Sequence, residues 1–184
     1  MRRARGSGSV NYGDPQAQPA DFLVDNVSLL PPGRVLDVAM GEGRNALYLA
    51  RLGFQVDGVD ISAEAVERVR ELAALGSLSL AATVGDLEDG YMIEEEAYDA
   101  IVCFNYLQRS LFPALRAGLR RGGLVIYETF IVDQAALFGK PRNPDFLLRH
   151  NELLDLFREF RCLRYREGVF EGRGAVAGIV AVKP

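Results

Sequence analysis

The sequence predicts a single α/β domain with a doubly wound, mostly parallel sheet. Short apolar segments alternate with helical segments of roughly ten to fourteen residues, an order that is typical of βαβ units. The 184 residues correspond to one domain at roughly 150 residues per domain. Near the end of the chain, two apolar segments follow the last predicted helix with only a glycine-rich link between them. We therefore expect the last strand to run antiparallel.

The first half of the chain begins with a segment that is poor in large apolar residues. Residues 1–20 are rich in Gly, Ser, Gln and Pro and are predicted to form a flexible arm before a domain at 21–184. After it, hydrophobic periodicity and capping residues mark each element. In order, we predict a helix at 22–30, a strand at 34–38, a helix at 41–52, a strand at 54–60, a helix at 62–75 that Ser62 caps and Gly76 ends, and a strand at 79–84.

The second half continues this alternation and then changes. In order, we predict a strand at 99–104, a helix at 111–119 that Gly122 and Gly123 end, a strand at 124–129, a helix at 151–160, and strands at 162–167 and 175–182. Residues 130–148 are predicted to be a long loop over the edge where the parallel strands end, since long irregular loops in small domains often cover a site.

Composition narrows the function classes. The chain has 21 basic and 25 acidic residues, a net charge of −4, whereas proteins that bind duplex nucleic acid usually carry a basic surface. The longest apolar run is about eight residues, too short for the ~18–20 that cross a membrane. Cys103 and Cys162 lie among apolar neighbours and are predicted to be buried thiols in a reducing, cytoplasmic setting. With one histidine they cannot complete a zinc site, so no metal is expected.

The most informative segment is Val-Leu-Asp-Val-Ala-Met-Gly-Glu-Gly-Arg-Asn-Ala at 35–46. A strand runs into a glycine loop that opens a helix, and Gly41 and Gly43 let a ligand approach the backbone without a Cβ in the way. Two ligand classes use such a loop. The spacing of Gly41, Gly43 and Ala46 matches the dinucleotide pattern G-x-G-x-x-G/A. Sites for S-adenosylmethionine instead combine a strand-end acid with small residues at alternate positions, here Asp37, Ala39, Gly41 and Gly43.

Asp37 distinguishes the two ligand classes. A pyrophosphate has no use for a carboxylate before its glycine loop, whereas the ammonium of an amino-acid ligand can pair with one. Asp60 ends the second predicted strand and suits a ribose diol. Asp86 follows the third strand and can accept a hydrogen bond from an adenine amino group. Acids at three successive strand ends therefore predict a site for S-adenosylmethionine.

With these segments, the sequence resembles the class I S-adenosylmethionine-dependent methyltransferases, and among them the small tellurite-resistance-type (TehB-like) subgroup. Further matching segments lie at 59–62, 85–87, 105–109, 121–124, 127–130 and 143–148. The resemblance implies a Rossmann-like sheet of seven strands with an antiparallel last strand. It also implies methyl transfer to a small-molecule acceptor with S-adenosylhomocysteine as product. Ala39 departs from the family pattern, in which this position is glycine.

The candidate site residues fall into three groups. The cofactor group comprises Asp37, Ala39, Met40, Gly41, Gly43, Arg44, Asn45, Asp60, Ile61, Asp86, Leu87 and Phe104. The catalytic group comprises Asn105 and Tyr106 at the end of the fourth strand and Glu128 as a candidate general base. The substrate group comprises Tyr12, Lys140 and Arg142. Simpler interpretations stand beside several of these: core packing for Met40, a helix-start solvent residue for Asn45, a structural carboxylate for Glu128, and solvated charges for Lys140 and Arg142.

Three functions remain open. The first is methyl transfer to a thiol, a thiopurine-like compound or a chalcogen oxyanion. The second is an NAD-dependent oxidoreductase, which Asp37 and the lack of a substrate domain disfavour. The third is an S-adenosylmethionine-binding protein without catalysis. No large insertion indicates a protein or nucleic-acid acceptor, so a small molecule is expected, with no membrane partner.

Overall fold

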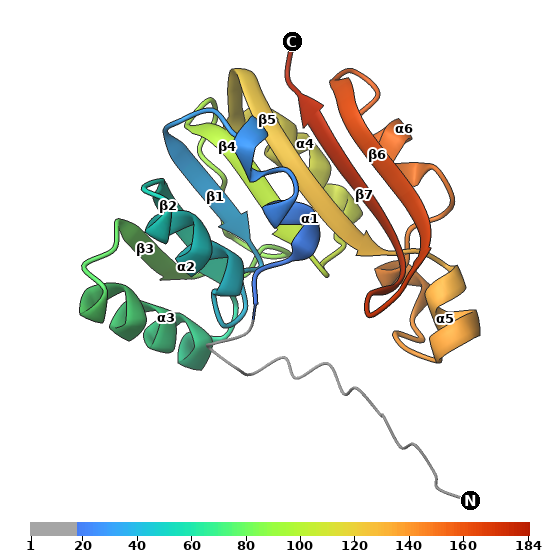
Figure 1. The fold of residues 1–184 in the computed structure, drawn as a ribbon, viewed down its shortest axis with the longest axis horizontal. Helices are drawn as coiled ribbons and strands as arrows, with labels where there is room; N and C mark the ends of the chain where they lie inside the picture. The colour runs from blue at the N-terminus through green and yellow to red at the C-terminus, as the bar shows by residue number, and fades with distance from the viewer. Residues whose placement is uncertain (1–17) are drawn as a thin grey trace, which may run out of the picture.

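The computed structural model describes residues 18–184, which form one mixed sheet with helices on both faces (Figure 1). The sheet has seven strands in the order β3-β2-β1-β4-β5-β7-β6. β7 is antiparallel to both of its neighbours, while β1 to β5 pair in parallel. The predicted fold class is confirmed. The strands are β1 (Arg34–Val38), β2 (Gln55–Asp60), β3 (Leu80–Val84), β4 (Tyr98–Phe104), β5 (Leu119–Phe130), β6 (Arg161–Phe170) and β7 (Gly174–Val182).

Two helical layers cover the sheet. In Figure 1, α1 and α2 lie on one face and α4 and α6 on the other, while α5 lies beyond the carboxyl end of β5. The α helices are α1 (Asp21–Val24), α2 (Arg44–Arg51), α3 (Ala63–Leu75), α4 (Phe112–Gly118), α5 (Asp133–Phe138) and α6 (Glu152–Leu156). Short 3₁₀ helices are η1 (Val27–Leu29), η2 (Arg109–Leu111) and η3 (Pro144–Phe146). Within residues 18–184, no helix is long and apolar enough to cross a bilayer.

Each face of the sheet has its own core. Val35 belongs to the core beneath α1, α2 and α3, whereas Leu36 belongs to the core beneath α4 and α6. Successive residues of a strand point to opposite faces, so a strand covered on both sides needs a continuous apolar run. This is why the apolar segments of this sequence predict strands well.

Local signals place several boundaries where the sequence predicts them. β1 has the predicted bounds, and the Ser62 hydroxyl accepts a hydrogen bond from the Ala65 N–H at 3.2 Å as the cap of α3. The prediction that Gly122 and Gly123 end the fourth helix is wrong. α4 ends at Gly118 and both glycines lie inside β5, where the Gly122 N–H donates to the Lys183 carbonyl.

Other predicted elements are shorter or broken. The helix predicted at 151–160 is only α6, and the predicted loop at 130–148 contains α5 and η3. Cys103 is buried as predicted, but the prediction for Cys162 is wrong because that thiol is exposed. Cys162 lies on β6, the edge strand of the sheet, which has a neighbour on one side only.

The first described residue, 18, lies three residues before the predicted start of the domain at 21. Ala20 is fully buried, and its N–H donates to Asn45 Oδ1 at 2.9 Å. Most of the predicted arm, with Tyr12, lies outside the described residues.

Candidate functional site

The candidate site lies where the direction of the strand order reverses. From β1 the chain builds the sheet outward through β2 and β3, then returns to add β4 on the other side of β1. Val38 of β1 pairs with Val59 and with Cys103, so the segments after these strands meet at one edge. In open α/β sheets, ligands bind at such a switch point, outside the carboxyl ends of the strands.

Asp37 places a carboxylate in the buried interior at this edge. Its side chain is 1% exposed, and its Oδ2 has no hydrogen-bond partner among the described residues. Burial raises the pKa of Asp37 to about 7, against the lowering effects of Arg44 and of the Ala46 backbone N–H. A buried carboxylate oxygen without a partner is costly. The position therefore suits a ligand group that carries positive charge or donates hydrogen bonds.

The two glycines of the loop have different roles. A Cβ built on Gly41 would meet nothing within 4 Å, whereas one built on Gly43 would lie 2.5 Å from Val69 Cγ2 of α3. Both have positive φ, +55° and +75°, which favours glycine. The open backbone that the sequence predicts at both positions is found at Gly41. At Gly43 the missing side chain allows α3 to pack against the loop.

Met40, Asn45 and Ala39 have structural roles in or next to the loop. Met40 is buried in the core directly against Gly58. Asn45 is 4% exposed and accepts the Ala20 N–H. Asn45 is therefore not exposed to solvent, and its side-chain oxygen already has a hydrogen-bond partner within the protein. Ala39 takes φ +54° before the glycines, so the turn has already begun at the position where the family pattern has glycine.

Asp60 connects the loop to the second strand. Its Oδ2 accepts the Gly41 N–H at 2.8 Å and its Oδ1 accepts the Ser62 N–H at 2.9 Å. Each carboxylate oxygen has a further lone pair, so this arrangement is compatible with a hydrogen bond to a diol. Beside it, Ile61 is 66% exposed.

The end of β3 completes the row of acids. Asp86 Oδ1 accepts the Glu88 N–H at 2.9 Å, which shapes the turn after the strand, and Leu87 packs against the core. Because β1, β2 and β3 are neighbours in the sheet, Asp37, Asp60 and Asp86 lie at three adjacent strand ends. The structure therefore assembles the row of carboxylates that the sequence predicts.

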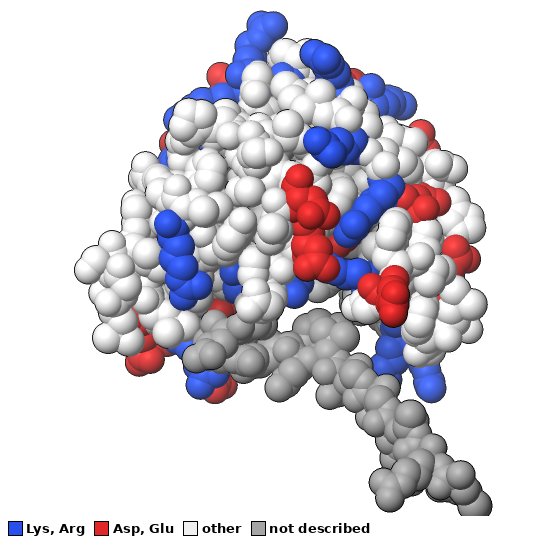
Figure 2. Space-filling view, in the orientation of Figure 1, with Lys and Arg blue, Asp and Glu red and all other residues white. Residues whose placement is uncertain are grey.

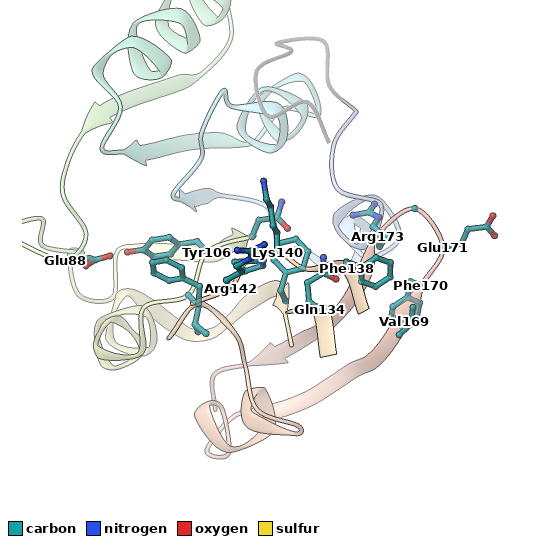
Figure 3. A pocket seen from close by; sticks show the side chains of 17 residues that line it. Glu88, Tyr106, Gln134, Phe138, Lys140, Arg142, Val169, Phe170, Glu171 and Arg173 are labelled. Atoms are coloured by element: carbon teal, nitrogen blue, oxygen red, sulfur yellow. The ribbon is translucent and has the colours of Figure 1, made fainter. Parts of the chain in front are cut away.

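A cavity of about 1430 Å³ lies on the β4 side of this edge (Figure 3). Of the predicted residues, it brings together Asn105, Tyr106, Lys140 and Arg142. Asn105 follows β4 with φ +58°, and buried Phe104 precedes it. Burial and the nearby Glu88 carboxylate raise the pKa of Tyr106 to about 12, so its hydroxyl stays protonated at neutral pH.

Several cavity residues were missed by sequence reasoning. They come from α5, from the segment before α6 and from the turn between β6 and β7, and they include Gln134, Phe138, Phe146, Phe170 and Arg173. Two signals in the sequence relate to them. The loop predicted at 130–148 over this edge includes Gln134, Phe138 and Phe146, and the glycine-rich link at 168–174 indicates a turn but not where that turn lies relative to β4.

Glu128 does not line this cavity. It is 2% exposed, and it pairs with Arg166 Nε at 2.8 Å and with Arg173 Nη1 at 3.6 Å. Burial raises the pKa of Glu128, although the hydrogen bonds from Arg166 lower it. Arg166 in turn lies over the rings of Phe22 and Phe170, 4.4 and 4.8 Å from their centroids. This geometry is that of a structural carboxylate that holds β5, β6 and the turn together.

Arg109 holds the segment that carries Lys140 and Arg142. Its guanidinium donates to both carboxylate oxygens of Glu152, at 2.6 and 2.9 Å, and to the carbonyls of Asp145 and Leu147. Although burial of Glu152 raises its pKa, the hydrogen bonds from Arg109 and Arg149 lower it to about 2. The pair is therefore ionised at neutral pH and fixes one wall of the cavity.

Charges on the molecular surface are mixed. Figure 2 shows basic and acidic side chains interspersed among uncharged ones on the face that carries α1 and α2. Within residues 18–184, no group of three or more His, Cys, Asp or Glu side chains is arranged to hold a metal ion.

Comparison with known proteins agrees with this geometry. The family model described as "Tellurite resistance protein TehB" matches residues 17–175. A probable S-adenosyl-L-methionine-dependent methyltransferase TehB of Haemophilus influenzae is 27% identical over 157 residues, which cover 81% of this chain and 53% of the relative. The chain thus spans about half the length of the curated relatives that it matches.

Solved structures share the fold. The crystal structure of TehB from Haemophilus influenzae matches with a TM-score of 0.77 at 23% identity, covering 90% of this chain and 62% of that chain. The crystal structure of the PH0226 protein from Pyrococcus horikoshii matches with a TM-score of 0.74 at 18% identity, covering 96% of this chain and 97% of that chain.

Proposed function

Because the chain belongs to the TehB tellurite-resistance protein family, we propose that it transfers a methyl group from S-adenosylmethionine to a small-molecule acceptor. The observation that carries the proposal is Asp37 on β1, whose buried Oδ2 has no hydrogen-bond partner among the described residues; the glycine loop that follows β1 has open backbone at Gly41. A ligand with an ammonium group would satisfy that oxygen. The Haemophilus influenzae relative, a probable S-adenosyl-L-methionine-dependent methyltransferase, supports the proposal.

The residues at the β1, β2 and β3 ends would hold the cofactor. We assign the amino-acid part to Asp37 and the glycine loop, the ribose to Asp60 and the adenine to Asp86. The sulfonium supplies an activated methyl group, so the protein contributes mainly binding, orientation and electrostatics. Because the sulfonium already activates the methyl group, the proposed transfer requires neither a metal ion nor a nucleophilic side chain of the protein.

The acceptor would bind on the β4 side of the same edge. Asn105 and Tyr106 are proposed to contact it, together with Lys140 and Arg142, which line the same cavity. A role for Tyr12 stays a prediction outside the described residues. Glu128 is not proposed as a general base because its carboxylate is bound to two guanidinium groups.

Calorimetric titration of the full 184-residue chain tests the cofactor. We expect heat with S-adenosylmethionine and S-adenosylhomocysteine but none with NAD, and a large loss of affinity in Asp37→Asn. Binding of NAD in place of S-adenosylmethionine would favour the oxidoreductase. A second assay measures S-adenosylhomocysteine formed with thiols, thiopurines and chalcogen oxyanions. Cofactor binding without turnover across this panel would indicate a binding protein without catalysis.

A further inference from the structure

The walls of the cavity are largely apolar. Phe130, Phe138, Phe146 and Phe170 line it together with Val169. Three of these side chains are unusually open to solvent for their type: Phe138 is 53% exposed, Phe146 51% and Val169 57%. Exposed large apolar side chains that gather around one hollow mark a binding surface. The ligand of this cavity therefore has an apolar body.

The cavity also has basic side chains near its middle. Among the cavity residues, Arg173 is neutralised by ion pairs with Glu128 and Asp21. Lys140 and Arg142, by contrast, make no ion pair with any residue from 18 to 184. No carboxylate in the part of the chain that the structure describes is therefore within ion-pair distance of these two cations.

The acidic side chains of the cavity are set apart from these cations. In Figure 3, Glu88 and Glu171 lie at opposite ends of the group, while Lys140 and Arg142 lie between them. The wall that Lys140 and Arg142 form thus presents positive charge beside aromatic rings. Such a surface complements an anionic group that is attached to an apolar body.

Resting on the methyl transfer proposed above, we propose that the acceptor is an amphipathic organic anion. Its aromatic or aliphatic body lies against Phe138, Phe146 and Phe170, and its carboxylate lies near Lys140 and Arg142. A small inorganic oxyanion gains nothing from the apolar walls of the cavity. Pockets that bind drug-sized organic ligands are usually on the order of 300–1,000 Å³, so an organic molecule has room in a hollow of about 1430 Å³.

Direct binding of a probe pair tests the proposal without relying on turnover. We would titrate the full chain, with saturating S-adenosylhomocysteine, with 2-naphthoate, with the neutral 2-naphthamide and with selenite. We expect 2-naphthoate to bind roughly tenfold more tightly than the amide, since two exposed ion pairs contribute about 1.4 kcal/mol together. This preference should shrink as salt is raised, and selenite should show no binding.

Variants separate the charge from the apolar wall. In Lys140→Ala/Arg142→Ala, we expect naphthoate affinity to fall about tenfold to that of the amide, with amide affinity unchanged. In Phe146→Ala, both probes should weaken equally. Arg158→Ala, an exposed arginine outside the cavity, is the matched control and should change neither.

The outcomes distinguish this proposal from the function on which it rests. If S-adenosylhomocysteine binds but both naphthyl probes bind equally or not at all, the acceptor class is wrong and the proposed function stands. Selenite binding that depends on Lys140 and Arg142 would also overturn the acceptor class. If S-adenosylhomocysteine itself does not bind, the proposed function fails first.

Discussion

Replacement of Asp37 by asparagine should stabilise the free protein while weakening its binding of cofactor. The variant keeps the shape of the side chain and removes its charge from a position that is 1% exposed. Burial raises the pKa of Asp37 from 3.8 to about 7, so between these pH values the folded chain holds a proton that the unfolded chain releases. The stability provided by that proton is complete below about pH 4 and is lost as pH rises through about 7.

The size of the effect follows from the two pKa values of Asp37. At about 1.36 kcal/mol per pKa unit, the difference between 3.8 and about 7 corresponds to a loss of stability on the order of 4 kcal/mol in the wild-type chain at pH 8. Asparagine does not ionise and does not suffer this loss. The free energy of unfolding of Asp37→Asn should therefore exceed that of the wild type at pH 8 and approach it near pH 4.

Urea denaturation followed by circular dichroism, at several pH values between 4 and 8, measures this difference. Comparing the two chains at each pH cancels the titration of all other carboxylates. Calorimetry on the same samples should show weaker S-adenosylmethionine binding by the variant. A stability difference that does not change with pH would refute the inference that burial without a partner raises the pKa of Asp37. Unchanged cofactor affinity would refute its role toward the ammonium group.

Other substitutions test the remaining assignments. Asp60→Ala should weaken S-adenosylmethionine binding by ~1–3 kcal/mol in calorimetry, and unchanged affinity would mean that the ribose assignment is wrong. Gly43→Ala should lower the free energy of unfolding by ~2–4 kcal/mol, from a positive φ and overpacking against Val69. A second change, Val69→Ala, should relieve the overpacking, and no recovery in denaturation would contradict that contact. Glu128→Gln should destabilise the chain by ~3–5 kcal/mol because Arg166 loses its ionised partner, and it should leave the pH profile of methyl transfer unchanged. A lost ionisation in that profile would restore Glu128 as general base.

Much of the scaffold was readable from the sequence because its signals act over a few residues. The apolar run of β1, the Ser62 cap and the acid that ends each of three successive strands depend on near neighbours in the chain. Strand alternation and helix capping need no knowledge of the rest of the molecule. The fold class and the row formed by Asp37, Asp60 and Asp86 therefore followed from sequence reasoning.

Contacts between residues that lie far apart in the chain could be identified only from the tertiary structure. Gly41 and Gly43 look equivalent in sequence, but Val69 from α3 meets only the second. Glu128 ends a strand as a catalytic acid would, yet its partners Arg166 and Arg173 arrive from a hairpin about forty residues later.

The cavity proposed for the acceptor also depends on contacts between segments that lie far apart in the chain. Its walls come from the end of β4, from the segment around α5 and from the turn between β6 and β7. The sequence predicts the segment at 130–148 over the strand ends, but no local signal places the turn between β6 and β7 there. The sequence by itself determined the strand ends and the acids of the proposed cofactor site, because they depend on local periodicity. The packing of the closing hairpin against the segment after β5 determined the cavity proposed for the acceptor, because strand order and register set which distant side chains come within reach of one another.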